Sequence, residues 1–186
     1  MHTSTVKQVG EVQFPVFAGD KIYMRKFYKK RGLPEDINRW QGVVDAMLET
    51  VDTDGPIFIM VDEDRVLADT THRRRGIHID GNWNEEIQCH GQPSPPTHGF
   101  TDLKEEGLIL ASNVTASAAY CGDWSGDIGE DGDCSTVDVS GLTRTELQKG
   151  KIYAGNVTML HESIPVLADC KRTLVRLNVP NYDISH

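Results

Sequence analysis

Short apolar segments, each bounded by turn-forming residues, recur along most of this chain and constrain its fold more than any other feature. Apolar, β-branched segments of this length are typical of strands. One amphipathic helix is predicted over 34–49, where Trp40, Val43, Val44 and Met47 recur at helical spacing. Strands are predicted at 56–61, 76–80, 107–114, 116–121, 151–153, 157–161 and 173–179. The sequence therefore predicts a mainly β protein with flanking helices (α+β), in which the helix packs on a sheet.

Charge and length narrow the class of protein. The 186 residues are expected to form one domain, 1–186, and carry 28 acidic against 19 basic side chains, a net charge of −9. This balance opposes broad attraction to nucleic acid or to an anionic membrane. No apolar run reaches the roughly 20 residues of a membrane span, and no secretory signal opens the sequence. With four irregularly spaced cysteines, typical of reduced thiols, we expect a cytoplasmic protein that acts on a small-molecule or peptidyl substrate.

Two histidines and one aspartate form a candidate metal site. In the predicted strand 76–80, alternation places His78 and Asp80 on one face of the strand. A second strand brings His161 about 80 residues later, a separation that lets a sheet fold back. Two imidazoles and a carboxylate are the ligands of non-haem Fe(II) oxygenases, which keep three metal positions open. A keto acid and dioxygen would bind there.

Two arginines follow in the segment 171–180, which contains the predicted strand 173–179. Thr173, Val175, Leu177 and Val179 alternate on one face, and Arg172 and Arg176 fall on the other. An inward-facing arginine is an uncompensated buried charge unless it meets an anion. A guanidinium binds a carboxylate through two parallel hydrogen bonds, so a dicarboxylate co-substrate would fit. The alternative is a solvated outer face that carries both arginines.

The segment 161–174 resembles the end of the catalytic core of Fe(II)/2-oxoglutarate-dependent dioxygenases, and of prolyl-hydroxylase-like members in particular. It shares a distal histidine, a Pro-Val pair and then an arginine, and with His78-Ile79-Asp80 the resemblance covers about 72–180. It implies a double-stranded β-helix (jelly roll, cupin-like) over 72–180, after a helix and strand extension over 1–70. It also implies that His78, Asp80 and His161 bind Fe(II). Arg172 is the first candidate to bind 2-oxoglutarate, and Arg176 is the second. The implied reaction consumes dioxygen, hydroxylates a C–H bond, and releases succinate and carbon dioxide.

Other sites and functions compete with the Fe(II) oxygenase interpretation. A structural zinc site would draw on Cys89, His90, His98, Cys121 and Cys134, but their spacing is poor for a tetrahedral cage. A cupin-like isomerase or a non-catalytic binding module would use the same fold without an oxygen step. The acidic segment 122–141 is expected to be a solvated loop near the active-site mouth rather than a calcium loop beginning at Asp127.

Several polar and aromatic residues lie near the candidate ligands in the sequence. Hydrogen-bonding partners commonly orient metal ligands, and tryptophans beside ligand strands can line a substrate pocket. The candidate orienting residues are Asn82, Tyr120, Tyr153 and Asn156, and the candidate pocket residues are Trp83 and Trp124.

Overall fold

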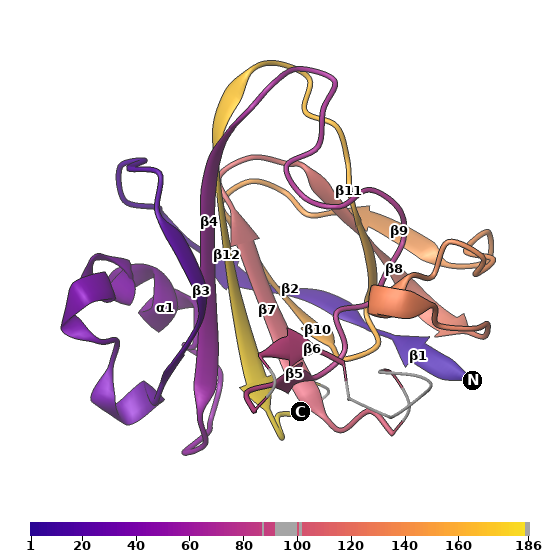
Figure 1. Ribbon diagram of the computed structural model, residues 1–186, viewed down its shortest axis with the longest axis horizontal. Helices are drawn as coiled ribbons and strands as arrows, with labels where there is room; N and C mark the ends of the chain where they lie inside the picture. The colour runs from indigo at the N-terminus through magenta and orange to yellow at the C-terminus, as the bar shows by residue number, and fades with distance from the viewer. Residues whose placement is uncertain (87, 92–99, 101, 185–186) are drawn as a thin grey trace.

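Antiparallel β-sheets carry most of the chain in the computed structural model, which describes residues 1–86, 88–91, 100 and 102–184 (Figure 1). The strands are β1 (His2–Ser4), β2 (Val6–Glu11), β3 (Lys21–Phe27), β4 (Ile57–Val66), β5 (Trp83–Asn84), β6 (Cys89–His90), β7 (Glu106–Ser112), β8 (Ser117–Trp124), β9 (Thr143–Glu146), β10 (Lys151–Asn156), β11 (Leu160–Ser163) and β12 (Cys170–Pro180). The helical elements are helix α1 (Gln41–Met47) and the 3-10 helices η1 (Lys29–Arg31), η2 (Glu35–Trp40) and η3 (Glu130–Gly132). The predicted mainly β class is confirmed.

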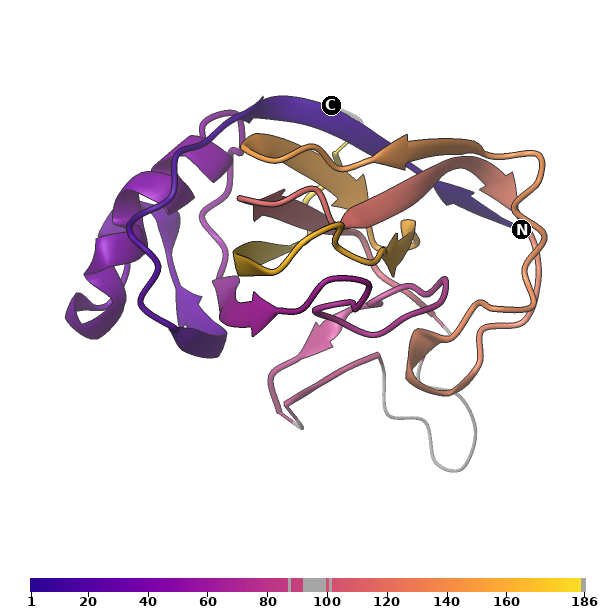
Figure 2. The same ribbon diagram turned by 90° about the horizontal axis from the view of Figure 1, so that it is seen from above.

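The strands form two principal sheets. The larger sheet has the order β2-β10-β7-β12-β4-β3, and the smaller has the order β1-β8-β11 with β9 paired to β8. Strands β5 and β6 form a separate short hairpin. Figures 1 and 2 show α1 and its neighbouring 3-10 helices η1 and η2 against one face of the six-stranded sheet, with the smaller sheet on the opposite side. Residues 1–70 supply β1 to β4 and so contribute to both sheets.

Strands β4 and β12 are neighbouring interior strands of the larger sheet and are buried on both faces, which explains their apolar composition. One face of each strand packs on the helical layer, together with the apolar stripe of α1. The residues in this layer include Trp40, Val43, Val44, Met47, Ile57, Ile59, Val61, Val175, Leu177 and Val179. The opposite face of β12 carries Arg172, Leu174 and Arg176, all less than a tenth exposed. The predicted alternation of this strand is confirmed, and a solvated arginine face is excluded.

The helix predicted over 34–49 is divided. Its first part is the 3-10 helix η2, and α1 begins only at Gln41. Strands β1, β2, β3, β5, β6 and β9 were not predicted. Strands β2, β3 and β9 contain many exposed positions, so they lack the apolar runs that identified the central strands. None of the helices among the described residues is long and apolar enough to cross a membrane.

Two predicted strands near the candidate ligands need correction. The segment 76–80 is extended but forms only isolated bridges from His78, to Asp133 and to His161. The strand predicted at 157–161 begins at Leu160, because a turn with a hydrogen bond from Met159 N to Asn156 O precedes it. That turn carries the chain from β10 in the larger sheet to β11 in the smaller one.

The acidic segment 122–141 is attached to the candidate ligand segment. The amide of Ile79 donates to the Gly132 carbonyl, and the amide of Cys134 donates to the Ile77 carbonyl. Gly132 has φ +77°, and a Cβ there would collide with the Ile79 carbonyl oxygen, so only glycine allows this approach. The side chain of Ile79 is fully buried in the cluster beneath this segment.

Candidate metal centre

The side chains of His78, Asp80 and His161 come together between the two sheets. Each offers one ligand atom, and these atoms all lie within 4.8 Å of one another. Two backbone hydrogen bonds of 3.0 Å join His78 to His161, and Asp80 Oδ2 lies 3.6 Å from His161 Nε2. Within the described residues, this is the one group of three or more His, Cys, Asp or Glu side chains with metal-site spacing. The structure thus brings all three predicted ligands together.

Both imidazoles are oriented by backbone carbonyls. His78 Nδ1 lies 2.8 Å from the Gly76 oxygen, and His161 Nδ1 lies 3.0 Å from the Met159 oxygen. These contacts assign the proton to Nδ1 and leave the Nε2 lone pairs free. Burial, reinforced by the neighbouring His161, lowers the pKa of His78 to about 4. His78 is therefore neutral at pH 7, the form that binds metals.

Arg176 holds the carboxylate of Asp80. Its Nη1 donates to Asp80 Oδ2 at 2.7 Å, and its Nη2 lies 2.8 Å from His90 Nε2. Burial opposes ionisation of Asp80, but Arg176 and the nearby imidazoles hold the pKa of this carboxyl well below its usual range. A carboxylate accepts about four hydrogen bonds or ligand bonds, so the bond from Arg176 leaves capacity for a metal.

Arg172 is buried without a carboxylate partner. Its side chain is 0% exposed, and it donates to Ser112 Oγ (3.3 Å) and Ser117 Oγ (2.9 Å). Nη1 is buried with no hydrogen-bond partner, and no ion pair among the described residues includes Arg172. Burial lowers the pKa of this guanidinium to about 10. Of the two predicted arginines, Arg176 thus has a protein anion and Arg172 has none.

A cavity of about 360 Å³ opens over the cluster. Its walls include all three predicted ligands and Arg176, together with apolar side chains from the larger sheet such as Met60. A cavity of about 20 Å³ beside it is lined by Arg172. The two cavities share Leu110, Ser117 and Leu174, so the Arg172 guanidinium lies next to the space above the cluster.

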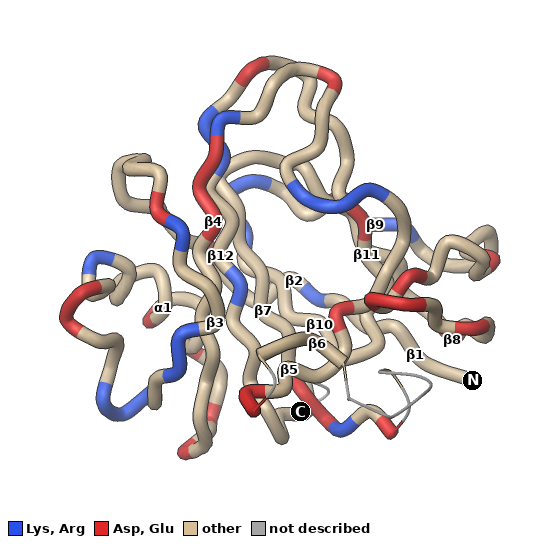
Figure 3. The backbone as a smooth tube through the Cα atoms, in the orientation of Figure 1, with Lys and Arg blue, Asp and Glu red and all other residues tan. Residues whose placement is uncertain are grey.

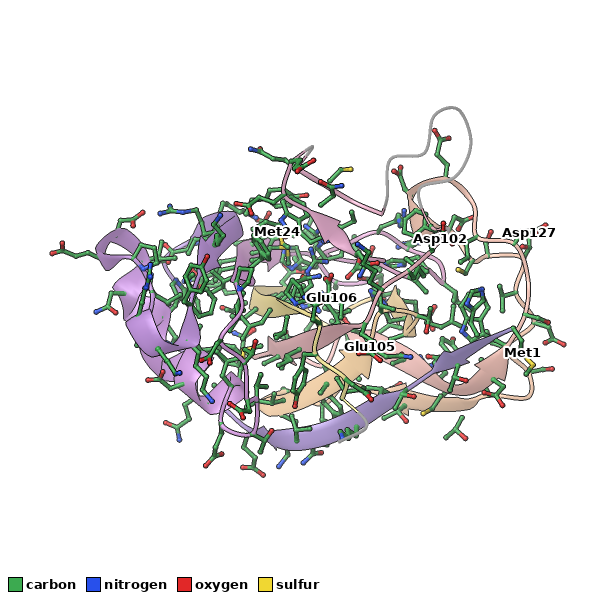
Figure 4. All side chains as sticks on the ribbon, turned by 90° about the horizontal axis from the view of Figure 1, so that it is seen from below. Met1, Met24, Asp102, Glu105, Glu106 and Asp127 are labelled. Carbon is green, nitrogen blue, oxygen red and sulfur yellow. The ribbon has the colours of Figure 1, made fainter. Side chains whose placement is uncertain are left out.

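A buried glutamate fixes the turn that follows Asp80. Glu106 accepts hydrogen bonds from the side-chain amides of Asn82 and Asn178 and from the backbone amide of Trp83. Burial raises the pKa of Glu106 above its ordinary value despite these donors. In Figure 4, Glu106 lies within the strand layers, whereas Asp127 lies at the edge of the molecule. The network connects the end of the ligand segment to β12.

Most of the predicted supporting residues act elsewhere. No hydrogen bond between described residues joins a ligand side chain to Asn82, Tyr120, Tyr153 or Asn156. Asn82 bonds Glu106 and Lys104, Tyr120 bonds Glu162, Tyr153 bonds Gln148, and Asn156 bonds Thr3, Thr5 and Thr158. Within the described residues, the ligand side chains are oriented by Arg176 and by two backbone carbonyls. The contacts to backbone carbonyls could not be predicted from the pattern of side chains in the sequence.

The two tryptophans proposed to line the pocket are core residues. Trp124 packs with Ile79 and Leu160, and Trp83 packs with Met24 and Phe58. Trp83 lies behind the cavity wall, in ring contact with Tyr23 and His90, both of which line the cavity.

The competing metal sites do not assemble among the described residues. Cys89, His90, Cys121 and Cys134 form no metal-ligating group, all four cysteines are free, and His98 lies outside the described residues. The carboxylates of 122–141 form no such group either. Asp131 of this acidic segment does line the cavity.

His90 is the residue of the site that sequence patterns missed. It comes from β6, lines the cavity and contacts Arg176. Burial, followed by the charge of Arg176, lowers the pKa of His90 to about 4. Its only sequence signal was its position beside Cys89, which pointed to zinc instead.

Comparison with known proteins gives distant structural matches only. No protein-family model matches the chain, and no curated protein matches it. EvdO2 from Micromonospora carbonacea var. aurantiaca, solved in complex with 2-oxoglutarate, is similar to 88% of this chain and is itself 70% covered, at 11% identity and a TM-score of 0.45. AviO1 from Streptomyces viridochromogenes Tue57 matches 94% of this chain and is 75% covered, at 13% identity and a TM-score of 0.39. These values are too low to transfer a ligand or an activity to this chain.

Proposed function

We propose that this chain is a non-haem Fe(II)- and 2-oxoglutarate-dependent oxygenase built on a double-stranded β-helix, the jelly roll of cupin-like proteins. It hydroxylates a C–H bond of a small-molecule or peptidyl substrate and releases succinate and carbon dioxide. His78, Asp80 and His161 hold the metal. A cytoplasmic location is part of the same proposal.

The observation that carries the proposal is the buried guanidinium of Arg172 beside a cluster of two histidines and one aspartate. A buried arginine without a counter-ion is unfavourable, so the site is incomplete without an anion. The far carboxylate of 2-oxoglutarate is such an anion. Ser112 and Ser117 already fix the guanidinium, which lowers the entropic cost of binding.

The residues present fit the metal. Two imidazoles whose Nδ1 atoms face backbone carbonyls, together with one carboxylate, are the donor set expected for non-haem Fe(II) with open positions. Bound iron and 2-oxoglutarate would supply the activation of dioxygen.

The chain supplies position and charge. Arg176 keeps Asp80 ionised and directs one of its oxygens, while backbone carbonyls fix both imidazoles. Arg172 anchors the co-substrate from the small cavity beside the cluster, and Met60 and Leu174 give the larger cavity an apolar wall.

The test is an anaerobic absorption spectrum with Fe(II) and 2-oxoglutarate. We expect a weak visible charge-transfer band that needs both additions and disappears in His161→Ala. The matched control is His2→Ala, because the His2 imidazole stacks on Trp124 outside the cluster. An unchanged band in His161→Ala would refute the ligand assignment.

The cupin-like alternative predicts a different outcome. A metal-binding jelly roll without an oxygen step would bind Fe(II) through the same cluster but show no band on addition of 2-oxoglutarate. Cupin sites generally use an additional histidine or a glutamate. The third imidazole of this cavity, His90, has its Nε2 in contact with Arg176, which does not favour that use.

A further inference from the structure

Two arginines outside the proposed metal and co-substrate sites line the large cavity. Arg73 and Arg74 belong to the segment between β4 and β5, where Figure 3 shows a run of basic residues. Arg73 Nη1 donates to Asp62 at 2.8 Å, and Arg74 Nη2 donates to the Asp131 carbonyl at 2.9 Å. These are their only hydrogen bonds within the described residues. Since a guanidinium has five N–H donors, both keep donors for a ligand.

The cavity is lined by more basic than acidic side chains, although the chain is acidic. The chain carries a net charge of −9, whereas the cavity is lined by three arginines, Arg73, Arg74 and Arg176, against two aspartates, Asp80 and Asp131. Asp80 is paired with Arg176, and Arg73 is paired with Asp62, which lies outside the lining. Arg74 forms no ion pair with a described carboxylate, because its partner at Asp131 is the backbone oxygen. Arg74 therefore keeps its positive charge available to an anion that enters the cavity.

Occupation of the proposed sites does not remove this excess. A divalent metal and the two carboxylates of 2-oxoglutarate carry equal and opposite charge, so they leave Arg74 without a counter-charge. The remaining donors of Arg73 and Arg74 lie on the same cavity as the cluster, as does the ring of Tyr23. They are placed to bind one end of a molecule whose other end reaches the metal.

We infer that the substrate is a small organic anion, bound through a carboxylate or phosphate group by Arg73 and Arg74. This inference rests on the proposed function for its reaction but concerns a separate part of the cavity. A cavity of about 360 Å³ fits a small molecule. Each arginine binds an oxyanion through charge-assisted hydrogen bonds.

The test measures binding of benzoate, phenyl phosphate and the neutral isostere benzamide by calorimetry. It is run on the full chain alone, and again anaerobically with saturating Mn(II) and 2-oxoglutarate. We expect benzoate or phenyl phosphate to bind at least about ten-fold more tightly than benzamide under both conditions. The advantage should largely disappear in Arg73→Gln/Arg74→Gln and fall in Arg74→Gln alone. The single variant is informative because it breaks no ion pair.

Arg75→Gln is the matched control, since Arg75 is an exposed neighbour that does not line the cavity. Equal binding of benzoate, phenyl phosphate and benzamide would overturn the inference. So would a loss in Arg75→Gln equal to that in Arg74→Gln, or a loss in Arg172→Gln alone. If 2-oxoglutarate fails to bind while the Arg73 and Arg74 dependence persists in the chain alone, the proposed reaction fails and the anion site stands.

Discussion

Replacing Arg172 with methionine is predicted to leave the metal-free protein at least as stable as the wild type. Burial lowers the pKa of this group from 12.5 to about 10. A shift of that size corresponds to an unfavourable free energy of about 3 kcal/mol for the charged form. The two hydrogen bonds to serines offset about 1–2 kcal/mol of it. Methionine keeps most of the apolar volume, so we expect the free energy of unfolding to change by about 0 to +2 kcal/mol.

The same substitution should abolish co-substrate binding. Urea denaturation followed by circular dichroism gives the stability, and calorimetry with Mn(II) gives the affinity for 2-oxoglutarate, which we expect to fall about a hundredfold or more. Arg144→Met is the control, because Arg144 is 40% exposed on β9 and its ion pairs should contribute little. A loss of more than about 2 kcal/mol of stability in Arg172→Met, with unchanged affinity for 2-oxoglutarate, would show that Arg172 is a structural residue instead.

Three further predictions concern the cluster and its supports. Gly132→Ala should destabilise the protein by about 1–3 kcal/mol in urea denaturation and weaken Mn(II) binding, because a Cβ at this position displaces the Ile79 carbonyl. The control Gly141→Ala should change neither stability nor Mn(II) binding, because the space around Gly141 is open. Arg176→Gln leaves the Asp80 carboxylate without its counter-ion, so the metal-free variant should have a lower melting temperature than the wild type. Mn(II) should raise the melting temperature of the variant by more than that of the wild type, and an equal rise would contradict the pairing of Arg176 with Asp80. The metal-free protein should also lose stability as the pH falls from about 6.5 to about 4, because the unfolded chain protonates His78 and His90 while the folded chain keeps them neutral. Each histidine contributes at most about 3 kcal/mol, and His90→Gln should reduce the loss measured by denaturation at pH 7 and pH 5.

The interior strands were predictable because strands that are buried on both faces are rich in apolar residues, and such runs are visible in the sequence. The run at 56–61 and the alternation at 173–179 became β4 and β12, and the latter placed Arg172 and Arg176 on one buried face. The exposed edge strand β3 left no such signal.

The candidate cluster followed from residue type and alternation, although its local structure did not. His78 and Asp80 point the same way because the segment is extended, even though only isolated bridges hold it. The contacts that complete the site depend on register and long-range packing. Asp80 meets Arg176 across 96 residues, and His90 approaches through a two-stranded hairpin. Neither contact follows from local sequence periodicity.

The most direct test of the central claim is a crystal structure of the protein grown with Mn(II) and 2-oxoglutarate in the absence of dioxygen. We predict an anomalous-scattering peak among the side chains of His78, Asp80 and His161, and a dicarboxylate whose far end meets the Arg172 guanidinium. A metal peak elsewhere, or a cluster that takes up neither metal nor dicarboxylate at saturating concentrations, would contradict it.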